Sequence, residues 1–167
     1  MEAYKILKYP DQRLFQTSKI VNESEFKTSE LNEIVARMFL TMKINEGIGL
    51  AAPQVDIHKR IIVMEVEQKR LVLINPNIIH RSEEKTSLVE GCLSIPMVSG
   101  SVERPRDIEV EYFDVNGIRY QLKCTGLLSK CVQHEIDHLN GVLYVNRIEG
   151  LKKRILLKKY EKINKCA

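Results

Sequence analysis

Long hydrophobic runs are absent from this sequence of 167 residues, and so is a recognisable export signal. No segment approaches the roughly 20 consecutive apolar residues that a membrane-spanning helix needs. The first residues, "MEAYKILKYPDQRLF", lack the apolar core and the small-residue cleavage site of a signal peptide. With 44% hydrophobic and 29% charged residues, the chain has the balance of a globular protein. We therefore expect a cytoplasmic protein with no membrane partner.

The sequence is also poor in cysteine and has little excess charge of either sign. Its four cysteines, Cys92, Cys124, Cys131 and Cys166, are irregularly spaced, which predicts reduced thiols and makes a cysteine near histidines a candidate metal ligand. A net charge of +4 does not by itself indicate nucleic-acid binding, and we expect no specific nucleic-acid sequence as a partner. The basic residues gather in 151–166, which holds seven Lys or Arg and one Glu.

Repeats, low-complexity stretches and linkers are absent too, so the length fits a single domain over residues 1–167. Apolar residues at helical spacing predict a helix over residues 29–45, with Ser29 as its N-cap. The basic residues 151–167 are expected to form a C-terminal helix with one apolar stripe. The predicted members of this stripe are Leu151, Ile155, Leu156 and Tyr160.

The middle of the chain is rich in β-branched residues. The segments "RIIVMEV" and "RLVLINPNII", residues 60–66 and 70–79, predict two strands separated by a polar turn. Residues 107–124, "DIEVEYFDVNGIRYQLKC", predict a β-hairpin turning at Asn116-Gly117. The pattern then returns to helix through "LLSKCVQHEIDHL". This order of elements predicts an α+β fold rather than alternating βαβ units.

The segment "CVQHEIDHLNG" places His134 and His138 four residues apart in this second helix. Side chains at that spacing project from one face, one turn apart, so both imidazoles can bind the same metal ion. Glu135 can exchange a proton with a metal-bound water instead of binding the metal. The alternative is a solvated helix face that contains two histidines by chance. We expect antiparallel strands around this central metal-binding helix, with an N-terminal helix and a C-terminal helix beside them.

A catalytic metal site usually takes three protein ligands and keeps one position for water. In an HExxH protease the third ligand would follow the helix, but Glu149 and Glu161 are the only Glu or Asp residues after His138. Upstream, Cys92 lies in the irregular Gly-containing segment "EGCLSIP", and its thiolate would complete a Cys-His-His site. Taken alone, without the histidine helix, Cys92 would be read as a small buried apolar residue.

A third segment, "GIGLAAPQV" at residues 47–55, has neither the phosphate-loop pattern nor the third glycine of a dinucleotide site. Its glycines allow another backbone to approach closely. Gln54 is the one side chain here that could donate to a developing oxyanion without binding the metal. A surface glutamine is the alternative.

Together, "GIGLAAPQ", "EGCLS" and "QHEIDH", in this order and at this separation, resemble the three signature motifs of bacterial-type peptide deformylases. The segments "YPDQRL", "RIIVM", "INP" and "GVLYVNRI" are similar to family sequence as well, so the resemblance covers nearly the whole chain. Members of this family remove the formyl group from the N-terminal methionine of newly made proteins. The resemblance therefore implies a metal-dependent hydrolase that acts on N-formylmethionyl nascent peptides and releases formate.

Carried onto this sequence, the resemblance implies a role for each motif residue. One divalent metal ion per chain would be bound by Cys92, His134 and His138. Metal-bound hydroxide would attack the formyl carbon, with Glu135 as the general acid/base. Gln54 and the backbone N–H of Leu93 would stabilise the oxyanion. The family's metal in the cell is usually Fe²⁺, with Zn²⁺, Ni²⁺ or Co²⁺ able to take its place, whereas the thiolate and imidazole donors alone would suggest zinc.

Helix geometry extends this prediction to the substrate pocket. Leu127 and Cys131 share the face of His134 and could form an apolar wall for the methionine side chain. Lys130, near the same face, is expected to contribute its aliphatic stem while its charge stays in water. The predicted substrate-binding residues are Ile48, Gly49, Leu88, Gly91, Leu127 and Cys131. The two glycines would let substrate backbone pair as an added strand, and the two leucines could instead be ordinary core.

Two other functions stay open on the residues alone. A metalloprotease would cleave unformylated peptides and would use a carboxylate or histidine as its third ligand. A non-enzymatic module would close a structural metal site with four protein ligands, so Cys131 or Cys124 would have to join it. The basic helix at 151–167 is either a solvated terminal helix or, as the resemblance implies, docks on the ribosome near the peptide exit.

Overall fold

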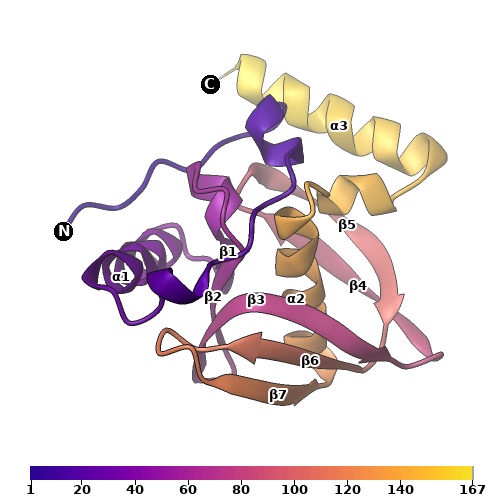
Figure 1. Cartoon of the computed structure of the whole chain (residues 1–167). Coiled ribbons are helices and arrows are strands. Elements are labelled where there is room, and N and C mark those ends of the chain that lie inside the picture. Colours follow the sequence, from indigo (N-terminus) through magenta and orange to yellow (C-terminus); the bar gives the residue numbers. More distant parts are fainter. Residues whose placement is uncertain (167) are drawn as a thin grey trace.

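Residues 1–166 are described by a computed structural model, in which helices and antiparallel strands form an α+β fold (Figure 1). The helices are α1 (Ser29–Ile44), α2 (Gly126–Leu139) and α3 (Gly150–Lys165). The strands are β1 (Gly49–Ala51), β2 (Ile61–Val66), β3 (Lys69–Arg81), β4 (Lys85–Cys92), β5 (Ile95–Pro105), β6 (Ile108–Phe113) and β7 (Arg119–Cys124). Short 3₁₀ segments lie at Gln12–Phe15, Glu23–Glu25, Ala52–Val55 and Tyr144–Arg147. The predicted fold class is confirmed.

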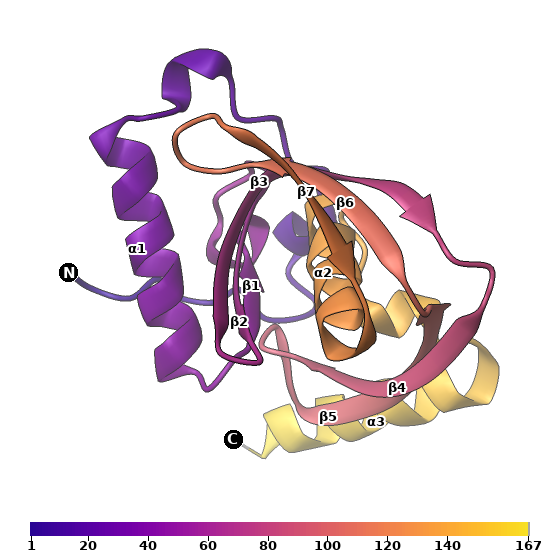
Figure 2. The same ribbon diagram turned by 90° about the horizontal axis from the view of Figure 1, so that it is seen from below.

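The strands form two separate sheets, and α2 lies between them. Five strands pair in the order β1-β2-β3-β6-β7, and β4 and β5 form a two-stranded ribbon of their own. Figure 2 shows α2 in the centre, with the five-stranded sheet curving around one side of it and the ribbon covering the other. Helix α1 packs on the opposite face of the sheet, and α3 runs along the outside of β5. The helix that carries the histidines is therefore enclosed.

Strand β2 explains why "IIVM" reads as a continuous apolar run. Ile61 and Val63 belong to the core formed with α1, whereas Ile62 and Met64 belong to the core formed with α2. Successive side chains of a strand point to opposite faces, so a strand covered on both faces has no polar positions to alternate with. The sheet is thus packed on both sides at the place where it supports α2.

Helix α1 agrees with its predicted span of 29–45 to within one residue, but its N-cap differs. Ser29 is already helical, and the N-cap is Thr28, whose hydroxyl oxygen accepts the N–H of Leu31 at 3.2 Å. Both residue types can cap a helix, so the choice depends on which backbone is extended, and Thr28 has that conformation (ψ 151°). The prediction of Ser29 as N-cap is therefore wrong by one residue.

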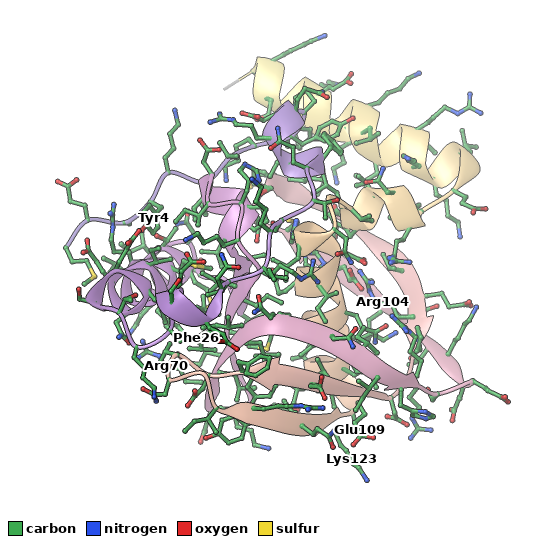
Figure 3. All side chains as sticks on the ribbon, in the orientation of Figure 1. Tyr4, Phe26, Arg70, Arg104, Glu109 and Lys123 are labelled. Atoms are coloured by element: carbon green, nitrogen blue, oxygen red, sulfur yellow. The ribbon has the colours of Figure 1, made fainter. Side chains whose placement is uncertain are left out.

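The predicted hairpin is confirmed as β6–β7, but its turn is longer than the two residues Asn116-Gly117. The Asp114 carboxylate accepts the N–H groups of Asn116 and Ile118, at 2.8 and 2.9 Å, and so organises a wider loop. Gly117 has φ +75°, and Phe26 packs against it, 3.3 Å from where a Cβ would lie. Figure 3 shows Phe26 in the segment before α1, beside this loop.

The apolar stripe predicted for the C-terminal helix is wrong in half of its members. Leu156 and Tyr160 are buried, but Leu151 and Ile155 are 67% and 58% exposed. Each residue advances an α-helix by about 100°, so Leu151 and Ile155 lie on a different side of the helix from Leu156 and Tyr160. The buried stripe continues instead through Ile163, at i, i+4 and i+7 from Leu156.

The ribbon β4–β5 was not predicted, and Cys92 ends its first strand rather than lying in an irregular segment. The register shifts between Gly91 and Cys92, so a bulge turns the cysteine at that point. None of the helices in residues 1–166 has the length and apolar character needed to cross a bilayer.

Candidate metal centre and substrate pocket

Helix α2 is buried on nearly all sides, and its polar and apolar residues separate into two faces. Apolar residues pack on the five-stranded sheet: Leu128, Val132, Ile136 and Leu139. Polar residues bond to the ribbon or to residues that hold it: Lys130, Gln133, His134 and Asp137. The sequence motif therefore lies inside the molecule, which contradicts the alternative of a solvated helix face.

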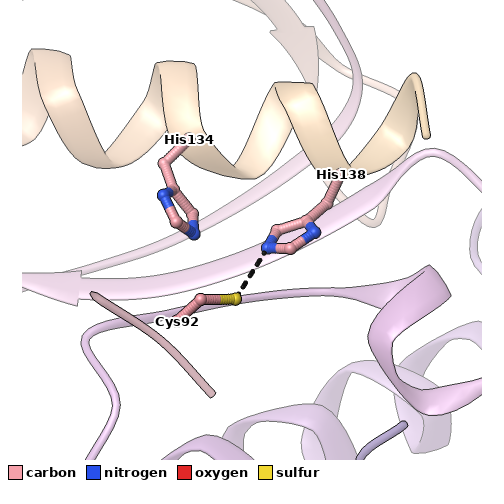
Figure 4. Close-up of side chains that lie close together, drawn as sticks. All are labelled: Cys92, His134 and His138. Atoms are coloured by element: carbon pink, nitrogen blue, oxygen red, sulfur yellow. Dashed lines mark hydrogen bonds between the residues drawn. The ribbon is translucent and has the colours of Figure 1, made fainter. Parts of the chain in front are cut away.

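The structure brings together the three residues predicted as metal ligands. One potential ligand atom from each of Cys92, His134 and His138 lies within 4.8 Å of the other two, and this is the one such group in the described part of the chain. Figure 4 shows the two imidazoles projecting from successive turns of α2 toward the thiol of Cys92 at the end of β4. The Cys92 Sγ and His138 Nε2 atoms are 3.3 Å apart.

A buried ionic network holds the His134 ring at its Nδ1 atom. The Nδ1 of His134 lies 2.9 Å from a carboxylate oxygen of Glu90, which leaves its Nε2 for the metal position. Arg104 donates to both oxygens of Glu90, at 2.6 and 2.9 Å, and to Asp137 at 2.8 Å. Asp137 also receives two hydrogen bonds from Arg147, both at 2.6 Å. Such carboxylate partners fix the tautomer and orientation of a ligating imidazole.

These network residues were missed from the sequence. The signal that could have found one of them is a glutamate, Glu90, next to two predicted site residues. Glu90 directly precedes Gly91 and Cys92 in a strand, and a carboxylate there is 8% exposed only because Arg104 reaches it from the facing strand. Burial alone raises the pKa of Glu90, but hydrogen bonds from Arg104 and His134 bring it down to about 2. The carboxylate is therefore ionised at neutral pH and accepts from the imidazole.

The donor set fits a divalent metal ion. Burial by itself raises the pKa of the Cys92 thiol, but the two imidazoles beside it outweigh burial and hold the pKa well below its usual range. A thiolate with two imidazoles suits zinc, iron, nickel and cobalt. Among the described residues, Glu135 Oε2 is a buried polar atom without a hydrogen-bond partner. An unpaired carboxylate oxygen beside such donors is what a site for a metal and its water would leave.

Glu135 is a buried carboxylate beside the three potential ligand atoms and is not one of them. It is 4% exposed, lines the pocket, and does not belong to the group of three ligand atoms. Burial raises the pKa of its carboxyl group above the ordinary value. One of its oxygens lies 2.6 Å from where a Cβ on Gly49 would be, so any other residue at position 49 would displace the carboxylate.

Gln54 is buried, so the alternative of a surface glutamine is wrong. Its Oε1 accepts the N–H of Ala51 at 2.9 Å, which turns the amide nitrogen toward the site. That nitrogen lies 3.2 Å from Ser94 Oγ and 3.5 Å from Cys92 Sγ. Leu93 follows Cys92 directly and lines the same pocket.

A cavity of about 440 Å³ opens beside Cys92, His134 and Glu135. All six residues predicted to bind substrate line it: Ile48, Gly49, Leu88, Gly91, Leu127 and Cys131. Leu88 and Leu127 are 39% and 44% exposed, so the alternative that they are ordinary core is wrong. The cavity has the size and mostly apolar lining of a small-ligand site.

Lys130 also lines this cavity, but its charge does not stay in water as predicted. The residue is 3% exposed, and its ammonium group donates to the carbonyl oxygens of Thr86 and Arg104. The prediction failed because the ribbon that covers this face of α2 was not foreseen.

The two alternative functions find little support in this geometry. Cys124 and Cys131 do not belong to the group of ligand atoms, so a closed structural site with four protein ligands is not formed in residues 1–166. Glu149 and Glu161, the downstream carboxylates that a protease would need, are exposed at α3. The three-ligand arrangement favours catalysis.

Comparison with known proteins points to one family. The family model for polypeptide deformylases matches residues 3–154. A peptide deformylase from Blochmanniella floridana is 44% identical over 168 aligned residues, which cover 99% of this chain and 93% of that protein. The structure of a peptide deformylase from Synechococcus elongatus in complex with actinonin is 44% identical with a TM-score of 0.89, covering 95% of this chain and 86% of that one. A Met-Ala-Ser-bound class I type b peptide deformylase from Acinetobacter baumannii is 34% identical with a TM-score of 0.85, covering 87% and 98%.

Proposed function

The chain belongs to the polypeptide deformylase family, and on this basis we propose that it removes the formyl group from the N-terminal formylmethionine of newly made proteins. The observation that carries the proposal is the group of Cys92, His134 and His138 with the buried carboxylate of Glu135 beside it, at one end of an apolar pocket. Hydrolysis adds water across the formyl C–N bond and yields formate and a free amino terminus. The Met-Ala-Ser peptide bound by the Acinetobacter baumannii relative supports a methionine-first peptide as the ligand.

We assign the metal to Cys92, His134 and His138, because these residues supply a thiolate and two imidazoles within reach of one ion. When bound, such an ion polarises water and the formyl carbonyl and makes a nucleophile available near neutral pH. Glu90 and Arg104 keep the His134 ring in place behind it. The family resemblance favours Fe²⁺ in the cell, while the donors suit Zn²⁺, Ni²⁺ and Co²⁺ as well.

Glu135 moves the proton. Its buried carboxylate has a raised pKa and one oxygen free of hydrogen bonds in the described structure, so it can take a proton from the attacking water. It then gives this proton to the nitrogen of the departing amine. The raised pKa helps both steps, because the group accepts a proton more readily than an ordinary glutamate and still releases it to an amine.

Gln54 and the backbone N–H of Leu93 would stabilise the negative charge that develops on the formyl oxygen. The amide of Gln54 is already oriented by Ala51, so no reorganisation is needed at the moment of reaction. The contribution of one such donor is commonly about 100-fold or more in rate. These donors act on the formyl group and not on the methionine side chain, for which the pocket is available.

The substrate backbone would pair between two free strand edges. In the described sheets β1 bonds only to β2 and β4 only to β5, so each leaves one edge without a partner strand. Gly49 of β1 and Gly91 of β4 line the pocket at these edges. An extended peptide could bond to backbone there while its first side chain enters the pocket, which makes recognition tolerant of later residues.

We further propose a cytoplasmic location, a single catalytic domain over 1–167 and docking of α3 on the ribosome. Exposed basic side chains on α3 support the last of these: Lys152, Arg154, Lys158, Lys159, Lys162 and Lys165. Phosphate-rich surfaces attract such clusters, and the attraction weakens with salt. Deleting residues 151–167 without loss of ribosome co-sedimentation at low salt would contradict the docking.

Formate release from formyl-Met-Ala-Ser tests the proposed reaction directly. The protein is purified without oxygen and loaded with Fe²⁺ or Ni²⁺, and the parent is compared with Glu135→Gln. We expect release by the parent and a loss of about 1000-fold in the variant, because Gln keeps the volume but cannot carry the proton. Metal content, measured on both proteins, should be equal.

Two controls separate this reaction from the alternatives. Glu149→Gln changes an exposed glutamate of the same type before α3 and should leave the rate unchanged. Acetyl-Met-Ala-Ser and an unformylated peptide should be poor substrates. Cleavage of the unformylated peptide at an internal bond, or no formate release from metal-loaded parent, would refute the proposed function.

A further inference from the structure

Lys130 is a buried charge in the wall of the substrate pocket. It lies on α2, one helical turn before His134, and its side chain lines the cavity although the residue is only 3% exposed. Burying an ammonium group is costly unless it is hydrogen-bonded, and lysine is almost never fully buried without partners. The partners of Lys130 therefore indicate its role.

These partners lie on both strands of the ribbon. The Lys130 ammonium donates to the carbonyl oxygen of Thr86 in β4 and, at 3.2 Å, to that of Arg104 in β5. Thr86 and Arg104 face each other directly in the β4–β5 register. One side chain of α2 thus holds both strands at the same point along the ribbon.

The ribbon needs such ties because it is not part of the five-stranded sheet. Near the metal centre, β4 is held to α2 by Glu90, which accepts from His134 at 2.9 Å. At its outer end β4 is held by Thr86, which accepts from Lys130. The residues of β4 that line the pocket are Leu88–Cys92, and the first of them lie between Thr86 and Glu90. The outer tie therefore bears on how far the wall formed by β4 stands from the wall formed by α2.

We propose that Lys130 is a specificity-determining positioning residue, whose buried ammonium group fixes the width of the pocket for the first side chain of the peptide. This inference rests on the proposed function. Its unbranched stem forms part of the wall on α2, and its charge holds the opposite wall at a set distance. Without the ammonium group the outer end of β4 can move away from α2, so the pocket would hold methionine less well and admit larger side chains.

Peptides that differ in their first side chain test the pocket width. The metal-loaded parent, Lys130→Met and Lys130→Arg are compared on formyl-Met-Ala-Ser and formyl-Phe-Ala-Ser. In Lys130→Met the preference for methionine, as a ratio of kcat/KM values, should fall about tenfold. The loss on the methionine peptide should appear in KM and not in kcat. Lys130→Arg keeps a cation with several donors and should restore most of the preference.

A matched control uses a lysine outside the pocket. Lys123→Met changes an exposed side chain of β7, which points away from the body of the molecule in Figure 3, and should leave the ratio unchanged. Amide hydrogen exchange supplies a second readout that does not depend on activity. Exchange at residues 86–90 should accelerate in Lys130→Met, while exchange in β2 stays as in the parent.

Each outcome decides the proposal. An equal loss on both peptides, or exchange at 86–90 that matches the parent, would overturn it. Should Lys130→Met not fold, Lys130→Gln replaces it, because its amide is too short to reach both carbonyl oxygens. If the parent releases no formate from either peptide, the proposed function and the specificity role fall together, whereas the exchange experiment still shows whether Lys130 holds the ribbon.

Discussion

Replacing Arg104 by Met should destabilise the protein far more than replacing any surface arginine. Arg104 is 3% exposed and lies between two buried carboxylates, Glu90 and Asp137. Removing one partner of a buried ion pair costs about 3–5 kcal/mol, because the remaining charge stays buried without compensation. Asp137 keeps Arg147, so the penalty falls mainly on Glu90. In a domain of this size the melting temperature should fall by about 10 °C.

Arg106 offers a matched comparison, because it also bonds to a glutamate, with Arg106 Nη1 2.9 Å from Glu84. Both partners are exposed, so Arg106→Met should cost less than about 1 kcal/mol. Thermal unfolding followed by circular dichroism, on metal-loaded and metal-free protein, measures both variants. Adding Glu90→Gln to Arg104→Met should recover part of the loss, since the unpaired charge is then gone. Equal melting temperatures for Arg104→Met and Arg106→Met would refute the reasoning.

Three further results are expected. Glu90→Gln should lower metal affinity about 10–100-fold in competition with a chelator, because the ligating ring loses its carboxylate partner; unchanged affinity would contradict this. Removing the metal should expose Cys92 to iodoacetamide at pH 8, and mass spectrometry measures the labelling. Burial raises the pKa of the Cys124 thiol to about 11, so this thiol stays protonated and should not be labelled. Labelling of Cys124 in the folded protein would contradict this expectation. Gly49→Ala should lower kcat for formate release at least about tenfold with little change in melting temperature, because its Cβ would displace the Glu135 carboxylate; a normal kcat would show that this carboxylate can shift freely.

The elements that the sequence predicted well are those whose pattern depends on one period. Helix α1 and strands β2 and β3 follow helical spacing or a β-rich run, and each was placed within about two residues, the usual uncertainty of boundaries. The ribbon was missed because the alternation of buried and exposed residues in β5 is broken near the start of the strand. Ile95 and Val98 are both buried although three residues apart, because Met97 between them has φ +69° and shifts the alternation by one. A left-handed methionine gives no signal in sequence.

In the candidate site, too, some residues could be predicted from the sequence and others could not. Its proposed metal ligands could be predicted because thiol and imidazole side chains at these spacings have few other uses, and the structure brings Cys92, His134 and His138 together. The residues that hold them could not be predicted, because Arg104 reaches Glu90 across a strand pairing fourteen positions apart in the chain. Pairing of that kind depends on register, and register is set by the whole ribbon.

The polar face of α2 contains a sequence signal for the ribbon that was not predicted. Its members recur at i, i+3, i+4 and i+7: Lys130, Gln133, His134 and Asp137. On a solvated helix such a stripe usually consists of charged residues that interact with one another. Here the stripe has an ammonium group, an amide, an imidazole and a carboxylate, and each has its partner on the ribbon. Because every one of these groups would be costly to bury alone, their mixture at one helical spacing indicates a covering element with complementary polar groups. That element is the ribbon, which carries Cys92 to the histidines.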